Sequence, residues 1–84
     1  MRVVLSLSEV AELFIQPPAT RGDGGYQSLL VSLQKSINRT TGELDLTEED
    51  LERIPRYAFD YGNGGWENRL VAIFGRVLGP KLGR

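Results

Sequence analysis

Few side chains in this 84-residue chain have types or spacings that could support catalysis. The sequence contains neither cysteine nor histidine, which excludes thiolate nucleophiles, imidazole bases and sulfur-ligated metal sites. Asp60 and Glu67 flank a glycine-rich turn and could act as an acid–base pair if they converged, but no pattern predicts that they do. The serines have no imidazole partner to activate them. We therefore expect a protein that is not an enzyme, with no metal and no cofactor.

Aromatic and arginine residues in the second half of the chain are the strongest candidates for binding. Tyr57, Phe59 and Tyr61 alternate within one predicted helical piece, so they cannot all face the same core and at least one should be exposed. Tyr, Trp and Arg are the residues most often found at the centres of protein interfaces. The sequence thus predicts a binding module for a protein partner, in a hetero-complex or a homodimer, such as an accessory or inhibitory subunit. The predicted contact residues are Arg53, Arg56, Tyr57, Phe59, Asp60, Tyr61, Asn63 and Gly64.

Two glycine pairs precede predicted helices and suggest a second kind of site. The free N–H groups in the first turn of a helix can bind an anion, and glycine allows a ligand to approach closely. The candidate anion-binding residues are Arg21, Gly24, Gly25, Gly65 and Arg69. The alternative is that the glycines only turn the chain, while Gln27 and Glu67 cap their own helices.

Residues 5–14, Leu-Ser-Leu-Ser-Glu-Val-Ala-Glu-Leu-Phe, resemble the first helix of helix-turn-helix domains of the excisionase and MerR type. The resemblance implies a short turn followed by a recognition helix that reads DNA. The chain departs from that pattern directly afterwards, with Pro17-Pro18 and a loop that reaches Gly25. Nucleic-acid binding is therefore the alternative function, through the Gly-Gly helix starts and helices lined by Arg53, Arg56, Arg69 and Arg76.

Charge is distributed unevenly along the chain. Residues 43–52 carry six acidic residues and no base, whereas basic residues predominate after residue 52. Acidic side chains are favoured at a helix N-terminus, so this distribution is typical of a solvated helix start. An isoelectric point of about 5.3 also argues against strong, unassisted phosphate binding. No apolar run approaches the length of a membrane span and no signal-peptide pattern is present, so we expect a cytoplasmic protein with no membrane contact.

The periodicity predicts an all-α fold, a compact four-helix domain that spans residues 1–84 as a single unit. Helices are expected from Ser6 or Ser8 to about Gln16, from Tyr26 to about Asn38, from Thr47 onward and from Trp66 to Leu78. Pro55 should kink or restart the third helix, and the tail at 81–84 should fray. A short strand pairing of residues 3–5 with 44–46 is left open.

The two halves of the chain, 5–42 and 44–80, resemble each other. Asp-Gly-Gly-Tyr-Gln at residues 23–27 recurs as Asn-Gly-Gly-Trp-Glu at residues 63–67. Duplication would give two helical hairpins whose aromatic helices bury against each other, but common amphipathic patterns can also converge by chance. The predicted core consists of Leu13, Phe14, Leu30, Leu33, Leu51, Ile54, Trp66, Leu70, Phe74 and Val77.

Overall fold

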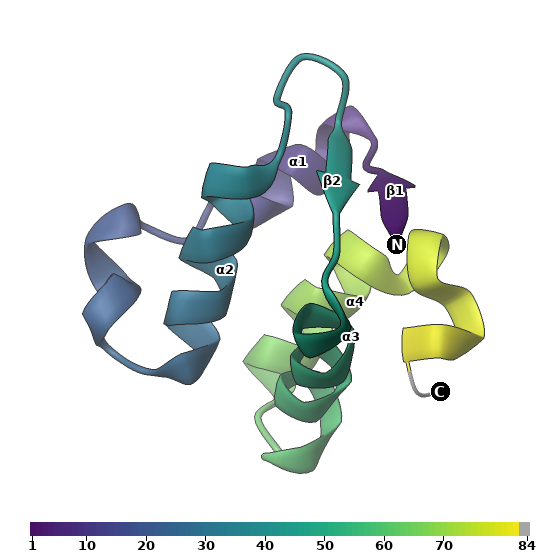
Figure 1. Ribbon diagram of the computed structural model, residues 1–84. Coiled ribbons are helices and arrows are strands. Elements are labelled where there is room, and N and C mark those ends of the chain that lie inside the picture. The colour runs from purple at the N-terminus through teal and green to yellow at the C-terminus, as the bar shows by residue number, and fades with distance from the viewer. Residues whose placement is uncertain (83–84) are drawn as a thin grey trace.

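The computed structural model describes residues 1–82 and is mostly helical, with a small two-stranded sheet beside four helices (Figure 1). This confirms the predicted mostly-α four-helix domain. The α-helices and strands are β1 Arg2–Val4, α1 Leu7–Leu13, α2 Gly25–Ser36, β2 Glu43–Asp45, α3 Glu48–Pro55 and α4 Gly64–Leu78. Three short helical segments join or extend them: η1 Pro18–Gly22, η2 Arg56–Asp60 and η3 Gly79–Leu82.

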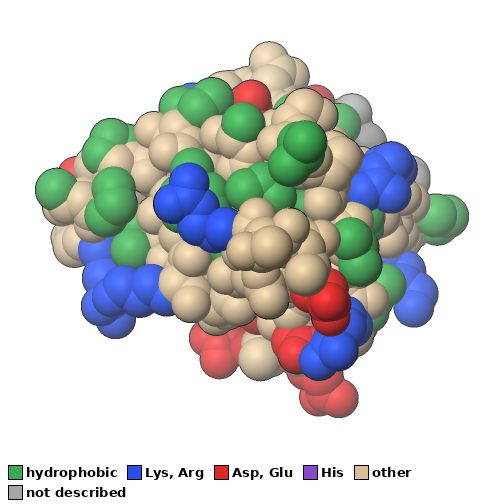
Figure 2. All heavy atoms as spheres, turned by 90° about the horizontal axis from the view of Figure 1, so that it is seen from above, with side chains coloured by type: hydrophobic (Ala, Val, Ile, Leu, Met, Phe, Trp, Pro, Cys, Tyr) green, Lys and Arg blue, Asp and Glu red, His purple; other side chains and the backbone are tan. Residues whose placement is uncertain are grey.

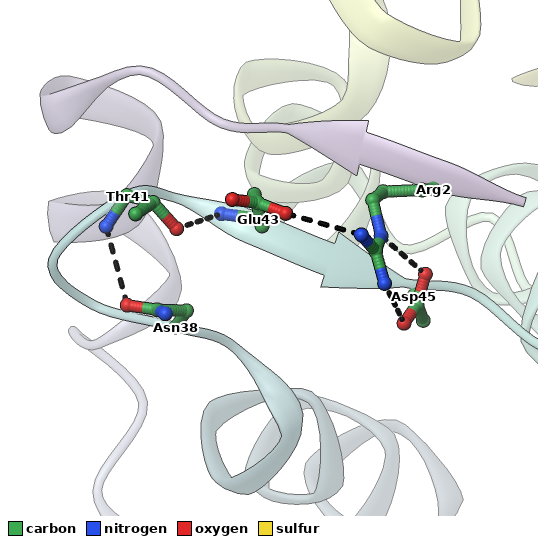
Figure 3. Close-up of polar contacts among 5 residues, drawn as sticks. All are labelled: Arg2, Asn38, Thr41, Glu43 and Asp45. Carbon is green, nitrogen blue, oxygen red and sulfur yellow. Dashed lines mark hydrogen bonds and ion pairs between the residues drawn. The ribbon is translucent and has the colours of Figure 1, made fainter.

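The strands β1 and β2 pair antiparallel, with Val3 opposite Leu44. The pairing is the one left open by the sequence, shifted by one residue in each strand. Side chains alternate across a strand, so Val3 and Leu44 are buried together while Arg2 lies on the outer face. There the Arg2 guanidinium binds Asp45 at 2.9 Å and Glu43 at 3.3 Å, across the two strands (Figure 3).

Capping side chains begin α1 and α3 as the sequence predicts. Ser6 caps α1 and Thr47 caps α3, each in a reciprocal capping box with the acidic residue three positions later. At the other end, α1 stops at Leu13 and does not reach Gln16. The residue before a proline is disfavoured in helical geometry, so Pro17 prevents the last expected turn.

Pro55 ends α3, and the chain continues as the π-helical segment η2. Because proline has no N–H, it cannot bond the carbonyl of Leu51, four residues earlier. The predicted restart before Arg56 is confirmed, and the restarted turn is wider than an α-helix. Such π turns occur often at functional sites.

Every residue that the sequence placed in the core either belongs to it or packs against it. Leu13, Leu30, Leu33, Ile54, Leu70 and Phe74 are fully buried, while Phe14, Leu51, Trp66 and Val77 pack against them while staying partly exposed. Leu82 is also buried, so the expectation of a frayed tail is wrong at this residue. The last two positions of that tail, 83–84, lie outside the described residues.

The order strand, capped helix, short helical turn, aromatic helix occurs twice along the chain. Corresponding elements of the two halves touch: β1 pairs with β2, and the ring of Tyr26 in α2 stacks on that of Trp66 in α4. Contact between equivalent elements is the pattern that a pseudo-twofold axis produces. Whether this repeat arose by duplication stays a prediction.

The two aromatic helices, α2 and α4, meet through the rings at their first turns, and α1 is the helix that packs along α4. The contact expected between the two aromatic helices is thus present at their first turns. Between α1 and α4, Arg76 binds Glu9 at 2.7 Å, and Leu13 of α1 lies in the same core cluster as Leu70 and Phe74 of α4.

Candidate functional site

The predicted contact residues occupy α3, η2 and the turn into α4, where they divide between two faces. Arg53, Tyr57 and Tyr61 form a stack on one face. Arg56, Phe59 and Asp60 line a hollow on the other. The sequence analysis grouped all of these residues as one surface. The structure separates them, because their side chains leave the helical stretch of α3 and η2 on two different sides.

An aromatic cluster, defined by Tyr26, Tyr57, Tyr61 and Trp66, runs from the core to the surface. Tyr26 and Trp66 stack with ring centroids 4.6 Å apart, and Tyr57 and Tyr61 stack at 5.3 Å. The Arg53 guanidinium lies 5.8 Å from the centre of the Tyr57 ring, a cation–π distance. Tyr26 is only 3% exposed and Tyr61 is 57% exposed. The cluster therefore holds an exposed ring, as predicted, on a rigid aromatic base.

Gly25 gives the first glycine pair a structural role. A β-carbon on Gly25 would collide with the Tyr57 hydroxyl, so only glycine fits there without a shift. The carbonyl of Gly25 also accepts a hydrogen bond from Arg53 Nη2 at 3.0 Å. Two residues of the second half thus cover the start of α2, and anion binding at Gly24 and Gly25 stays a prediction.

Asn63, which the sequence analysis assigned to partner contact, caps the helix that begins at the second glycine pair. Asn63 Oδ1 accepts hydrogen bonds from the N–H groups of Gly65, at 3.0 Å, and Trp66, at 3.1 Å. Asn63 and not Glu67 is therefore the N-cap of α4, which corrects the predicted capping residue. At the start of α2, no side chain caps the helix, Gln27 included. Gly64 lies in the first turn of α4 with open space around it.

A hollow of about 390 Å³ opens to solvent along one side of α3 and η2, which follow each other without a break. Its lining residues are Glu52, Pro55, Arg56, Phe59 and Asp60. The guanidinium of Arg56 is held by Glu52, one helical turn away. Asp60 has no ion-pair partner within residues 1–82. The hollow therefore combines half-buried apolar side chains, Pro55 and Phe59, with one unneutralised carboxylate.

The arginines expected to form a basic stripe are each paired with a carboxylate. The ion pairs are Arg53–Glu49 at 3.6 Å, Arg56–Glu52, Arg69–Glu12 at 3.9 Å and Arg76–Glu9 at 2.7 Å. Pairing reduces the charge that each guanidinium presents to a phosphate. Arg21 differs, since it is exposed on η1 with no ion pair among the described residues, and it lies in the other half from Arg69.

The Arg76 guanidinium holds the pKa of Glu9 below its usual range, through a hydrogen bond that outweighs the cost of burying the carboxylate. Burial raises the pKa of the Tyr26 hydroxyl, and the nearby Arg69 opposes part of that effect. Glu9 lies where α1 meets α4, and Tyr26 lies where the first turns of α2 and α4 meet. Neither residue lines the hollow.

Sequence reasoning missed a buried polar contact that shapes the turn after α1. Gln34 is 8% exposed, and its Nε2 donates to the carbonyls of Leu13 at 3.0 Å and Gln16 at 2.7 Å. Gln16 Oε1 in turn accepts from Arg69 at 3.3 Å. The available signal was the position of Gln34 on the apolar stripe of α2, next to Leu33 and three residues before Ile37.

The molecule's surface chemistry is mixed on the face seen in Figure 2, where hydrophobic side chains form several separate areas with Lys and Arg between them. Acidic side chains lie mainly along the lower edge of that view. Over residues 1–82, no helix is both long and apolar enough to cross a membrane. Comparison with known proteins gives no relative: no family model, no curated protein and no solved structure matches this chain.

Proposed function

We propose that this chain is a non-enzymatic binding module that docks a protein partner on η2 and the adjoining ends of α3 and α4. The observation that carries the proposal is the juxtaposition at η2: the exposed Tyr61 ring lies on a rigid aromatic cluster, and a hollow lined by Phe59 lies on the adjacent face of the same π turn. An interface of this kind needs an apolar anchor and a polar rim, and both are present here.

Preorganisation supports this choice of surface. The Tyr61 ring stacks face to face on the Tyr57 ring. It also meets the Trp66 ring edge-on, with the centroids of these two rings 5.6 Å apart. The Tyr61 ring therefore has little rotamer freedom to lose when a partner packs on it, which lowers the entropic cost of binding. Leu7 is still more exposed, at 86%, but it does not belong to the aromatic cluster.

A hetero-complex as an accessory or inhibitory subunit is the form we favour, with a homodimer as the second form. Nothing in the geometry specifically favours nucleic acid, because the arginines of the expected stripe are all paired with carboxylates. The salt dependence of binding distinguishes a protein partner from a nucleic acid, since counterion release makes the affinity for nucleic acid fall steeply with added salt.

Affinity capture from an extract of the source cells tests the proposal, at low and high salt and with and without nuclease. The bait variant carries Arg56→Ala and Tyr61→Ala, and the matched control carries Leu7→Ala, an exposed apolar residue outside the surface. Tyr57 is unsuitable as a test position, because it also packs against Gly25.

We expect the unaltered chain and the Leu7→Ala control to retain a stoichiometric protein through salt and nuclease, and the double variant to lose it. A partner that the double variant retains fully would show that the surface is wrong. Recovery of nucleic acid alone, lost at high salt, would favour the alternative function.

A further inference from the structure

The hollow along α3 and η2 holds one carboxylate that has no ion-pair partner among residues 1–82. Of its charged lining residues, Arg56 and Glu52 pair with each other, which leaves the carboxylate of Asp60. Helical spacing places Glu48 one turn before Glu52 on the same side of α3, and Glu48 is exposed. Among the described lining residues, the charge left to attract a ligand is therefore negative.

The lining of the hollow offers apolar and charged surface to a long side chain. Pro55 and Phe59 are half-buried and offer apolar surface beside the carboxylate. Lys and Arg carry an apolar stem with a charge at its end, so they can pack the stem on apolar surface and place the charged head at a carboxylate. Arg can also stack its guanidinium on an aromatic ring. The hollow is open to solvent, so it can receive a side chain laid along the surface but would not enclose a small molecule.

We infer that this hollow receives an arginine or lysine side chain of the protein partner, with its stem against Phe59 and Pro55 and its cationic head at Asp60. The inference rests on the proposed function and specifies the chemistry of the partner. An acidic side chain is disfavoured, because Arg56 already bonds Glu52 and Asp60 would repel a second carboxylate.

The test is an NMR titration of the ¹⁵N-labelled full chain with short synthetic peptides. The probe is the peptide acetyl-Ala-Leu-Arg-Leu-Ala-amide. Two matched peptides replace its arginine, one with citrulline, a neutral residue of the same shape, and one with glutamate. The protein variants are Asp60→Asn and the control Asp23→Asn, which changes the net charge equally at an exposed residue of the other half.

We expect the arginine peptide to shift the amide signals of residues 52–60, with binding about two- to fivefold weaker for citrulline or for Asp60→Asn, as for one exposed ion pair. The Asp23→Asn variant should bind as the unaltered chain does, and the glutamate peptide should not bind. Equal binding of the arginine and citrulline peptides, shifts elsewhere, or no shifts at millimolar peptide would overturn the inference.

The capture experiment separates failure of this inference from failure of the proposed function. If the Asp60→Asn variant captures the partner fully while the Arg56→Ala, Tyr61→Ala double variant loses it, the proposed binding surface is correct. The inference that a cationic side chain of the partner binds at Asp60 is then wrong. If neither variant loses the partner, both are wrong.

Discussion

The Tyr57 hydroxyl occupies the space that a β-carbon on Gly25 would need. Tyr57 belongs to η2 and Gly25 begins α2, so the contact fixes the proposed binding surface to the other half of the chain. Arg53 strengthens the same junction through its hydrogen bond to the Gly25 carbonyl. The exposed Tyr61 ring is thus held by packing that reaches into the core.

Gly25→Ala should destabilise the fold, because the added methyl group must displace the Tyr57 ring or the start of α2. We expect a loss of about 1–3 kcal/mol in the free energy of unfolding, measured by urea denaturation. Gly64→Ala is the matched control, since a β-carbon there meets open space, and it should change stability by less than about 0.5 kcal/mol. Equal effects of the two substitutions would contradict the close contact.

Gln34→Leu should also destabilise the fold, although leucine has a similar size and suits a buried position. The substitution removes the donor from the carbonyls of Leu13 and Gln16 and leaves these acceptors poorly satisfied. The expected cost is about 1–3 kcal/mol by urea denaturation. Lys35→Gln, at the exposed neighbouring position, should be close to neutral. A Gln34→Leu protein as stable as the unaltered chain would show that the two hydrogen bonds contribute little.

Acid should weaken the fold partly through Glu9, whose pKa Arg76 lowers in the folded state. Because the pKa of Glu9 is lower in the folded chain than in the unfolded chain, its stabilising effect is fully present above the unfolded pKa of about 4.3. The effect is lost as the pH falls through the pKa of Glu9 in the folded chain. Glu9→Gln should therefore reduce the loss of stability between pH 7 and pH 3, measured by thermal unfolding. Part of the loss should remain, because the pKa of Asp45 is lowered by Arg2 in the same direction. Identical pH profiles for the two proteins would exclude the contribution of Glu9.

Local signals in the sequence predicted most of the fold. The caps Ser6 and Thr47, the restart at Pro55 and the apolar stripes each depend on neighbours along the chain, so they can be read without the structure. The packing of α1 along α4 could not be read in this way. It brings together residues far apart in sequence, such as Arg76 and Glu9, whose side chains were each compatible with a solvated face.

The sequence predicted which residues form the candidate surface but not how these residues are arranged. Alternation of Tyr57, Phe59 and Tyr61 correctly required an exposed ring. The wider π turn and the hollow beside Phe59 depend on a backbone geometry that composition does not specify. The role of Gly25 could not be predicted from its sequence neighbours either. Glycine is needed there because the Tyr57 side chain, from the other half of the chain, occupies the space of a β-carbon.

Photocrosslinking in the source cells tests the central claim most directly. A benzoylphenylalanine replaces Tyr61 in one protein and the still more exposed Leu7 in a second. We expect the probe at position 61 to form a crosslinked adduct of one defined mass, and the probe at position 7 to form none. An adduct at position 7 alone, or at neither position, would contradict the assignment of η2 and its neighbours as the protein-binding surface.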